Sequence, residues 1–176
     1  MWGMDTAADS LRQDLGAEHQ AIVKVVGEFD GRLMIVKGWS VTLSLAGLGL
    51  GFQQGHYALF ALAAGTALAF WYIEALMKRH QMRYYPRMRE IEVAAYHLNH
   101  QDLDGVSVSS PQVDWSWTEA GRGVPQPYAP AEVRRMLSIA PWLPHVFLPH
   151  AVAVLLGAVL YFCALADLPG LAQLKP

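Results

Sequence analysis

The sequence predicts an all-α integral membrane protein with three transmembrane helices, cytosolic amphipathic helices and a long loop. Two apolar blocks, 34–52 and 57–77, are joined by a short polar turn, and a third apolar block covers 142–165. About twenty helical residues cross the roughly 30 Å hydrocarbon core of a bilayer, so each block is long enough to span it. The composition agrees, because 53% of the residues are hydrophobic and only 16% are charged, against about 25% in soluble domains.

These blocks divide the chain into five predicted segments. The first two are an N-terminal cytosolic amphipathic helix and a transmembrane hairpin, at 1–32 and 33–77. A cytosolic helix, a tryptophan-containing loop and a short helix follow at 78–141. The third transmembrane helix is expected at 142–166 and an external tail at 167–176. Because of the prolines at its start, the alternative for the third block is a re-entrant or interfacial segment.

The N-terminal segment has the pattern of an amphipathic helix. Ser10 and Gln13 fit a capping box at a helix start. Apolar residues then recur at spacings of three, four and seven, which gives one apolar stripe: Leu11, Leu15, Ile22, Val25, Val26, Phe29 and Leu33. We expect the stripe to pack on the other cytosolic helix or on a neighbouring subunit, with a position in the membrane surface as the alternative. The sequence leaves open whether Asp30-Gly31 bends the chain or one helix continues through it.

A lysine near the start of the hairpin and a glutamate near its end form a predicted ion pair. Folding the chain about the turn at 53–56 brings Lys37 within a helical turn of Glu74. We therefore expect them to pair at the cytosolic boundary of the membrane. The alternative is that both side chains point separately to water.

Small residues at four-residue spacing predict the packing faces of the spans. Lipid supplies no hydrophobic drive between helices, so association depends on close packing, which small side chains permit. We expect these faces to pack within the hairpin rather than between subunits, with Gly157 as the small residue of the third span. The predicted hairpin faces are Ser40, Ser44, Gly47 and Gly51 on the first helix, and Ala61, Gly65 and Ala69 on the second.

The densest positive charge follows the second span, at Lys78, Arg79, Arg83, Arg87 and Arg89. The positive-inside rule predicts a cytoplasmic location for this segment and for the N-terminus, with the C-terminus outside. The same cations could hold anionic lipid. An apolar pattern at helical spacing continues to about residue 99, and Pro86 predicts a kink or restart within it.

Residues 101–130 are rich in Gly, Ser and Pro and are predicted to form a loop. Alternating residues at 106–108 and 113–117 suggest a small β-hairpin around Ser110-Pro111. Trp115 and Trp117 lie in this loop, which points to a contact surface. A short helix is expected to begin at Pro130, a residue that suits the first helical position, and to cover 131–139.

No catalytic, metal-binding or cofactor-binding constellation is predicted. His145 and His150 enter the third span five residues apart, so they do not share a helical face as a metal pair would. They are candidates for an ion path, with burial near the interface as the alternative. His97, His100, Asp102 and Asp104 have ligand-like spacing but are expected to be the solvated end of a helix. A net charge of −2 argues against nucleic-acid binding.

The layout over 11–98 resembles the SLATT-type membrane modules of bacteria, with Lys37-Gly38-Trp39 and the basic run 78–89 in the corresponding places. The resemblance implies a membrane effector of a bacterial defence or conflict system that oligomerises into a pore. The third span and the tryptophan-containing loop are additions to that two-span pattern.

Two functions are therefore expected from the sequence. The first is a homo-oligomeric, non-enzymatic pore or membrane-perturbing effector of the bacterial inner membrane, whose partners are the lipid bilayer and its own copies. The alternative is a non-conducting subunit or scaffold that recruits a cytosolic protein through the loop at 101–130.

Overall fold

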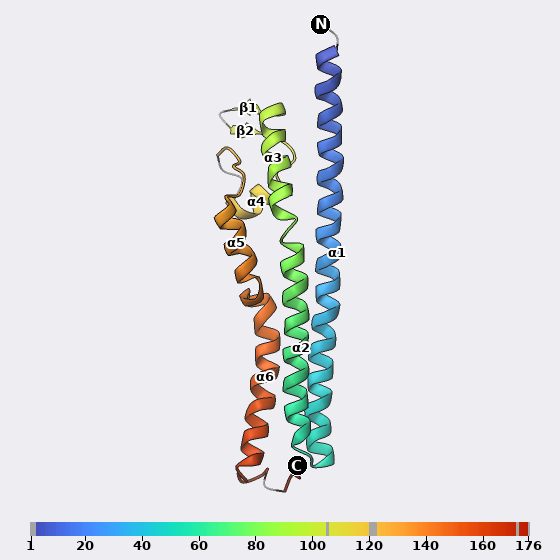
Figure 1. Ribbon diagram of the computed structural model, residues 1–176, viewed down its shortest axis with the longest axis vertical. Helices are drawn as coiled ribbons and strands as arrows, with labels where there is room; N and C mark the ends of the chain where they lie inside the picture. Colours follow the sequence, from blue (N-terminus) through green and yellow to red (C-terminus); the bar gives the residue numbers. More distant parts are fainter. Residues whose placement is uncertain (1–2, 105, 120–122, 172, 176) are drawn as a thin grey trace. The chain divides into compact units, whose positions relative to one another are not determined.

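The computed structural model describes residues 3–104, 106–119, 123–171 and 173–175 and is about 79% helical. Figure 1 shows its helices and one short β-hairpin. The helices are α1 (Gly3–Gln54), α2 (Ala58–Gln81), α3 (Tyr85–Asn99), α4 (Val113–Glu119), α5 (Pro130–Ile139) and α6 (Pro144–Leu165), with the 3-10 helix η1 at Ala140–Trp142. The strands are β1 (Gln101–Leu103) and β2 (Val106–Val108).

Three helical stretches are long and apolar enough to cross a membrane. They are Asp9–Gln54, Ala58–Asn99 and Pro130–Leu165. The three predicted apolar blocks lie within α1, α2 and the η1–α6 segment, respectively. The prediction of a mainly helical chain with three helices of membrane-spanning length is therefore confirmed.

The chain forms two compact units, each built from two pieces of sequence. Unit 1 contains Met1–Phe29 and His80–Leu137, and unit 2 contains Asp30–Arg79 and Ser138–Pro176. α1 is a single continuous helix that contributes to both units. Of the two alternatives at Asp30-Gly31, the structure therefore has one helix that continues through these residues.

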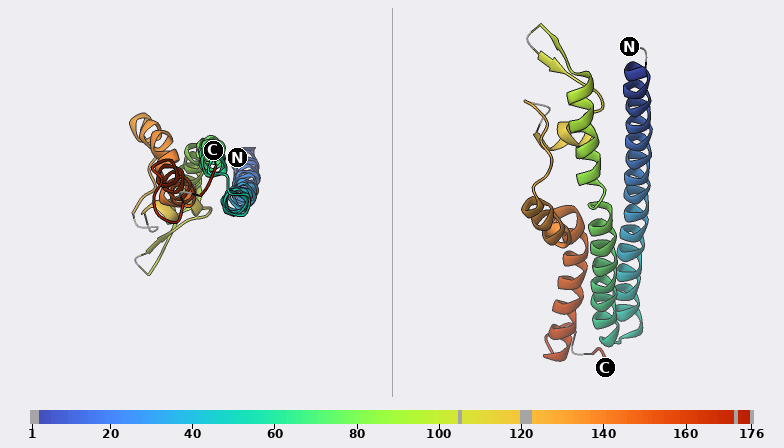
Figure 2. Two further views of the ribbon diagram at one scale, coloured as in Figure 1. Left: turned by 90° about the horizontal axis from the view of Figure 1, so that it is seen from below. Right: turned by 45° about the horizontal axis from the view of Figure 1, so that its top comes forward.

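Unit 2 consists mainly of three helical segments that run side by side: the C-terminal part of α1, α2 and α6 (Figures 1 and 2). The turn from α1 to α2 uses Gly55 at φ +72°, a left-handed conformation that glycine adopts without steric cost. Leu48, Phe60 and Ala63 form a buried core close to this turn. The C-terminal tail returns to the same turn, where the amide of Tyr57 donates to the carbonyl of Lys175 at 2.9 Å.

In unit 1, α3 packs beside the N-terminal part of α1, as both views show (Figure 2). Ile22 and Val26 of α1 meet Met88 and Ile91 of α3 in a buried core, which is the partner that the amphipathic stripe of α1 requires. α2 ends at Gln81 and α3 begins at Tyr85 with Pro86 in its first turn, so the predicted restart at the proline is confirmed.

Two local predictions were wrong. Helix α1 already runs from Gly3, so Ser10 and Gln13 lie inside it rather than at a capping box. The β-hairpin pairs β1 with β2 across Asp104, and 113–117 is part of helix α4 rather than a strand.

The helical state of α4 has a local cause. The carboxylate of Glu92 accepts the backbone N–H groups of Asp114 and Trp115 at 2.7 and 2.8 Å. The first N–H groups of a helix have no partner within the helix, and a carboxylate at that end satisfies them. The short helix predicted from Pro130 is present as α5.

Candidate functional site

The predicted pair of Lys37 and Glu74 is present in unit 2. Lys37 Nζ on α1 lies 3.2 Å from Glu74 Oε1 on α2. Glu74 is 1% exposed, so its charge lies away from solvent. A buried carboxylate needs a partner for each oxygen, and Lys37 supplies one of them.

His150 supplies the other partner and brings in the third helix. Its Nε2 lies 2.8 Å from Glu74 Oε2, and its Nδ1 lies 2.8 Å from the hydroxyl of Ser40. An ionised carboxylate only accepts hydrogen bonds, so Nε2 donates to Glu74, while Nδ1 and the Ser40 hydroxyl share the second hydrogen bond. We call Lys37, Ser40, Glu74 and His150 the unit 2 network. It joins α1, α2 and α6.

Backbone carbonyl groups complete the polar contacts around this network. Lys37 Nζ donates to the carbonyl of His145 at 2.7 Å, and Trp71 Nε1 donates to the carbonyl of Pro141 at 3.0 Å. The side chain of His145 is exposed. Of the two histidines proposed for an ion path, His150 is thus held inside the network, whereas His145 joins it only through its carbonyl.

The network has the connectivity of a serine, histidine and acid triad but not its surroundings. Ser40 is 1% exposed, so an incoming substrate has no access to its hydroxyl. It also lies in the middle of α1, where backbone N–H groups donate within the helix, so they cannot serve as the oxyanion donors that acyl transfer requires. The arrangement instead satisfies buried charge and ties three helices together.

Three glycines of unit 2 lie where helices approach closely. A Cβ added at Gly47 would lie 3.1 Å from the Cβ of Ala63, and one at Gly51 would meet the ring of Phe60. At Gly157 it would lie 2.7 Å from the carbonyl oxygen of Phe60. Ser44 also faces α2, where its hydroxyl donates to the Ala63 carbonyl at 3.5 Å. These predicted packing residues are therefore at helix contacts.

The packing face predicted for α2 was wrong. Ala61, Gly65 and Ala69 are exposed, and a Cβ at Gly65 would meet nothing within 4 Å. The buried face of α2 runs instead through Phe60, Ala63, Ala64 and Ala67. α2 contacts both α1 and α6. The part of its surface that faces these two helices does not include the small residues at 61, 65 and 69.

A second buried polar cluster lies in unit 1 around Arg89, which is 3% exposed. Arg89 Nε donates to Asp114 Oδ2 at 2.8 Å, and its guanidinium lies 4.8 Å from the ring centre of Trp115 and 4.5 Å from that of Tyr128. The Tyr128 hydroxyl donates to the same Asp114 oxygen at 2.9 Å. We call Arg89, Asp114, Trp115 and Tyr128 the Arg89 clasp. It fixes the segment after the β-hairpin to α3.

Two further acceptors complete the clasp: the hydroxyl of Thr118 and the carbonyl of Gln126, the latter 3.3 Å from Arg89 Nη1. Burial raises the pKa of Asp114, and this effect outweighs the neighbouring Arg89 cation. Burial, together with the Asp114 carboxylate, raises the pKa of Tyr128 to about 12. The phenol is thus held in its neutral, hydrogen-donating form.

The five cations predicted for topology or lipid binding have different environments. Arg79 and Arg83 are exposed. Arg87 bonds Glu18 through Nε and Nη2, each at 2.8 Å, and Lys78 Nζ lies 3.8 Å from Asp30. Arg89 is enclosed in the clasp, so the alternative that it holds anionic lipid is wrong for this residue, because a buried guanidinium cannot reach a head group. Its role in topology stays a prediction.

The two predicted contact tryptophans also differ, since Trp115 is 7% exposed and Trp117 is 66% exposed. Only Trp117 can meet a partner.

Three residues of unit 1 were not predicted from the sequence: Glu92, Asp114 and Tyr128. Glu92 and Arg89 lie beside the apolar stripe of α3, and this position could have indicated that they are buried. Nothing in the sequence indicated a role for Tyr128.

Within the described ranges, no three His, Cys, Asp or Glu side chains gather as a metal ion would require. A comparison of the chain with known protein families, curated proteins and solved structures finds no match. Functional interpretation therefore depends on the geometry of the two units.

Proposed function

We propose that this chain is a non-conducting membrane scaffold that presents the 101–130 segment to a protein partner. One observation carries the proposal: the Arg89 clasp holds α4 against α3, while Trp117 of the same helix is exposed. A large aromatic side chain held by an ordered backbone is the kind of anchor that dominates protein interfaces. Among the residues of this segment whose burial the structure describes, Leu103, Val108 and Val124 are also large, apolar and exposed.

The membrane location rests on the three apolar helices. No Asp, Glu, Lys or Arg occurs between residues 38 and 73 or in α6, so these stretches suit a hydrocarbon environment. The exposed cations Arg79 and Arg83 follow the second span and favour a cytoplasmic location for unit 1 by the positive-inside rule. The inner membrane of a bacterium is the location that the layout favours.

The pairing of the charged groups supports the proposal that this chain does not conduct ions. Lys37 and Glu74 bond each other, and the carboxylate also holds His150. An ion path needs polar groups that can exchange partners with the passing ion. Here the charged groups of the spans face one another inside unit 2, which favours a structural role over transport.

The scaffold proposal can be tested by site-specific photo-crosslinking in cells. A photoreactive residue at Trp117 should give a discrete adduct with a second protein, and one at the exposed His97 of α3 should not. Arg89→Met should abolish the adduct, because it releases the segment from α3. Absence of an adduct at 117, or an adduct that survives Arg89→Met unchanged, would contradict the proposal.

A second candidate function is the oligomeric pore or membrane-perturbing effector. The observation that favours it is the row of Ala61, Gly65 and Ala69, whose small side chains face out of unit 2 and could receive a helix of another subunit. The oligomeric mass in nanodiscs tests this. A complex of four or more copies that is lost in Gly65→Leu but kept in Gly49→Leu would favour the pore, since both glycines have open space around them. A monomer would leave no central pathway.

A further inference from the structure

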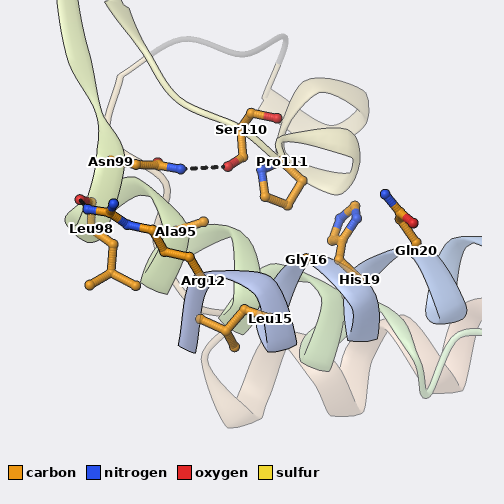
Figure 3. A pocket seen from close by; sticks show the side chains of 10 residues that line it. All are labelled: Arg12, Leu15, Gly16, His19, Gln20, Ala95, Leu98, Asn99, Ser110 and Pro111. Carbon is orange, nitrogen blue, oxygen red and sulfur yellow. Dashed lines mark hydrogen bonds between the residues drawn. The ribbon is translucent and has the colours of Figure 1, made fainter. Parts of the chain in front are cut away.

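Unit 1 contains a cavity of about 210 Å³ between α1 and the C-terminal end of α3 (Figure 3). Leu15 and Leu98 supply apolar walls, and Pro111 covers the cavity from the opposite side. Asn99 Nδ2 donates to the Ser110 carbonyl at 3.1 Å, which ties the covering segment to α3. A neighbouring hollow of about 410 Å³ shares His19 and Pro111 with it. The cavity belongs to neither the unit 2 network nor the Arg89 clasp.

His19 forms one end of the cavity and is held in a fixed orientation. It is 3% exposed, and its Nε2 lies 3.1 Å from Glu92 Oε1. Glu92 also accepts two backbone N–H groups of α4, so it acts as an ionised acceptor and Nε2 of His19 carries the hydrogen. In the neutral imidazole the other ring nitrogen, Nδ1, is then a hydrogen-bond acceptor.

Nδ1 of His19 has no protein partner among the described residues. Among these residues, Trp115 Nε1 is the side-chain polar atom that is fully buried and makes no hydrogen bond. Nδ1 of His19 is therefore not sealed, and because His19 lines both the cavity and the neighbouring hollow, this nitrogen opens toward these two adjoining spaces. A nine-tenths buried imidazole thus presents an unused acceptor to a space of small-molecule size.

Arg12 forms the other end. Its Nη1 donates to Asp9 at 3.2 Å and its Nη2 to the Leu98 carbonyl at 2.8 Å. A guanidinium has five N–H donors, so donors remain for a ligand. Arg12 and His19 are seven residues apart, which places them on one face of α1 about 10 Å apart along its axis. Gly16 lies between them, and a Cβ there would meet nothing within 4 Å.

We propose that this cavity binds a small, elongated carboxylic acid with a hydrogen-bond donor at the end opposite its carboxylate. The ligand's carboxylate accepts hydrogen bonds from Arg12, and its donor group bonds Nδ1 of His19. The alkyl chain of the ligand lies along α1 at Gly16, which has no side chain. An ω-amino acid has this chemistry. The proposal uses contacts within unit 1 only and does not depend on the scaffold or the pore function.

The probe is 5-aminopentanoate, and the experiment is saturation-transfer NMR and calorimetric titration on the full-length protein in nanodiscs. We expect dissociation constants of about 1 mM, because so small a ligand makes few contacts. Pentanoate lacks the donor and 1-aminopentane lacks the carboxylate, so each should bind about tenfold more weakly or not at all. No binding of 5-aminopentanoate at about 10 mM, or equal binding of the three probes, would overturn the proposal.

A cavity-filling variant locates the binding. Gly16→Leu places a side chain in the open space between Arg12 and His19 and should abolish binding. Gly27→Leu is the matched control, because Gly27 is also a glycine of α1 in unit 1 with nothing within 4 Å of its Cβ position, and it does not line the cavity. Both changes replace glycine within a helix, so both should keep or raise stability. Equal binding by the two variants would show that the probe binds elsewhere.

Arg12→Gln provides the chemical test. It removes the cation and should make 5-aminopentanoate bind no better than 1-aminopentane. Circular dichroism and thermal unfolding verify that each variant is folded. If Arg12→Gln still prefers the amino acid over the amine, the assignment of the carboxylate to Arg12 is wrong.

Discussion

The two units each contain a buried carboxylate held by a cation, but the two carboxylates connect different kinds of structure. In unit 2, Glu74 pairs with Lys37 and His150, and every member of the network lies on a long helix. In unit 1, Asp114 lies on the short helix α4 and pairs with Arg89, and this pair fixes α4 and the chain next to it to α3. Glu74 and Asp114 are 1% and 2% exposed.

The difference shows what buried charge contributes in each setting. Helices packed through small residues have few directional contacts, so they can slide or rotate at small cost. The unit 2 network joins three of them at fixed points and specifies their register, a role that buried polar groups have in other helical assemblies. The described residues between 109 and 130 include few buried apolar side chains, so their position against α3 depends on the polar and aromatic contacts of the clasp.

The largest effect is expected for Glu74→Leu. It leaves Lys37 without its buried partner, and breaking such a pair from one side costs about 3–5 kcal/mol. Thermal unfolding of the detergent-solubilised protein, followed by circular dichroism, should show a large loss of stability. The double variant Lys37→Met/Glu74→Leu should recover much of it, because no lone charge remains. Near-wild-type stability of the single variant would mean that the network does not hold the helices.

A smaller, local effect is expected for Arg89→Met. Asp114 loses its cation and Tyr128 loses the guanidinium against its ring, at a cost of about 2–4 kcal/mol. The loss should appear first as protease cleavage within 101–130, while the three long helices stay protected. Arg83→Met is the control, because Arg83 is exposed and such surface changes stay within about 0.5 kcal/mol. Cleavage that rises equally in both variants would argue against the clasp.

Two glycine substitutions compare the packed and open faces of the unit 2 helices. Gly157→Ala puts a methyl group 2.7 Å from the Phe60 carbonyl oxygen, and overpacking of this kind costs about 1–3 kcal/mol. Gly65→Ala meets open space and should stabilise the helix by about 0.5–1 kcal/mol through helix propensity. Thermal unfolding measures both. A destabilising Gly65→Ala would indicate that a second copy covers that face.

Features that follow from local periodicity were predictable from the sequence. The apolar blocks define the long helices, and the short turn at 53–56 sets the register of α1 against α2, which is sufficient to pair Lys37 with Glu74. Pro86 and Pro130 mark helix starts because proline lacks the N–H group that a helix interior needs.

Features that depend on long-range contacts were not predictable. In α2, small residues occur on several faces, so periodicity could not distinguish the row at 61, 65 and 69 from the face that contacts α1 and α6. α4 is helical because Glu92, about twenty residues earlier in the chain, satisfies its first N–H groups. The alternating residues at 113–117 do not indicate that contact. The clasp and the cavity at His19 likewise require knowledge of how α3 packs against α1 and the segment after the β-hairpin.

The smallest expected effect concerns the pH dependence of the clasp. The pKa of Tyr128 is raised to about 12 in the folded chain, against about 10 for a free tyrosine. Above pH 10 the unfolded chain therefore loses this proton before the folded chain does, and unfolding becomes more favourable. The contribution of the phenol to stability is complete below about pH 10 and is lost as the pH rises through 12.

The stability difference between the wild type and Tyr128→Phe should consequently narrow between pH 10 and 12. Denaturant titrations across that range would measure it, with Tyr72→Phe as a control that removes an exposed phenol of unit 2. Because the clasp lies in unit 1, the narrowing should coincide with increased protease cleavage of 101–130 in the wild type. A constant difference across this range would mean that the Tyr128 hydroxyl does not keep its proton through its bond to Asp114, and the clasp would then depend on Arg89 alone.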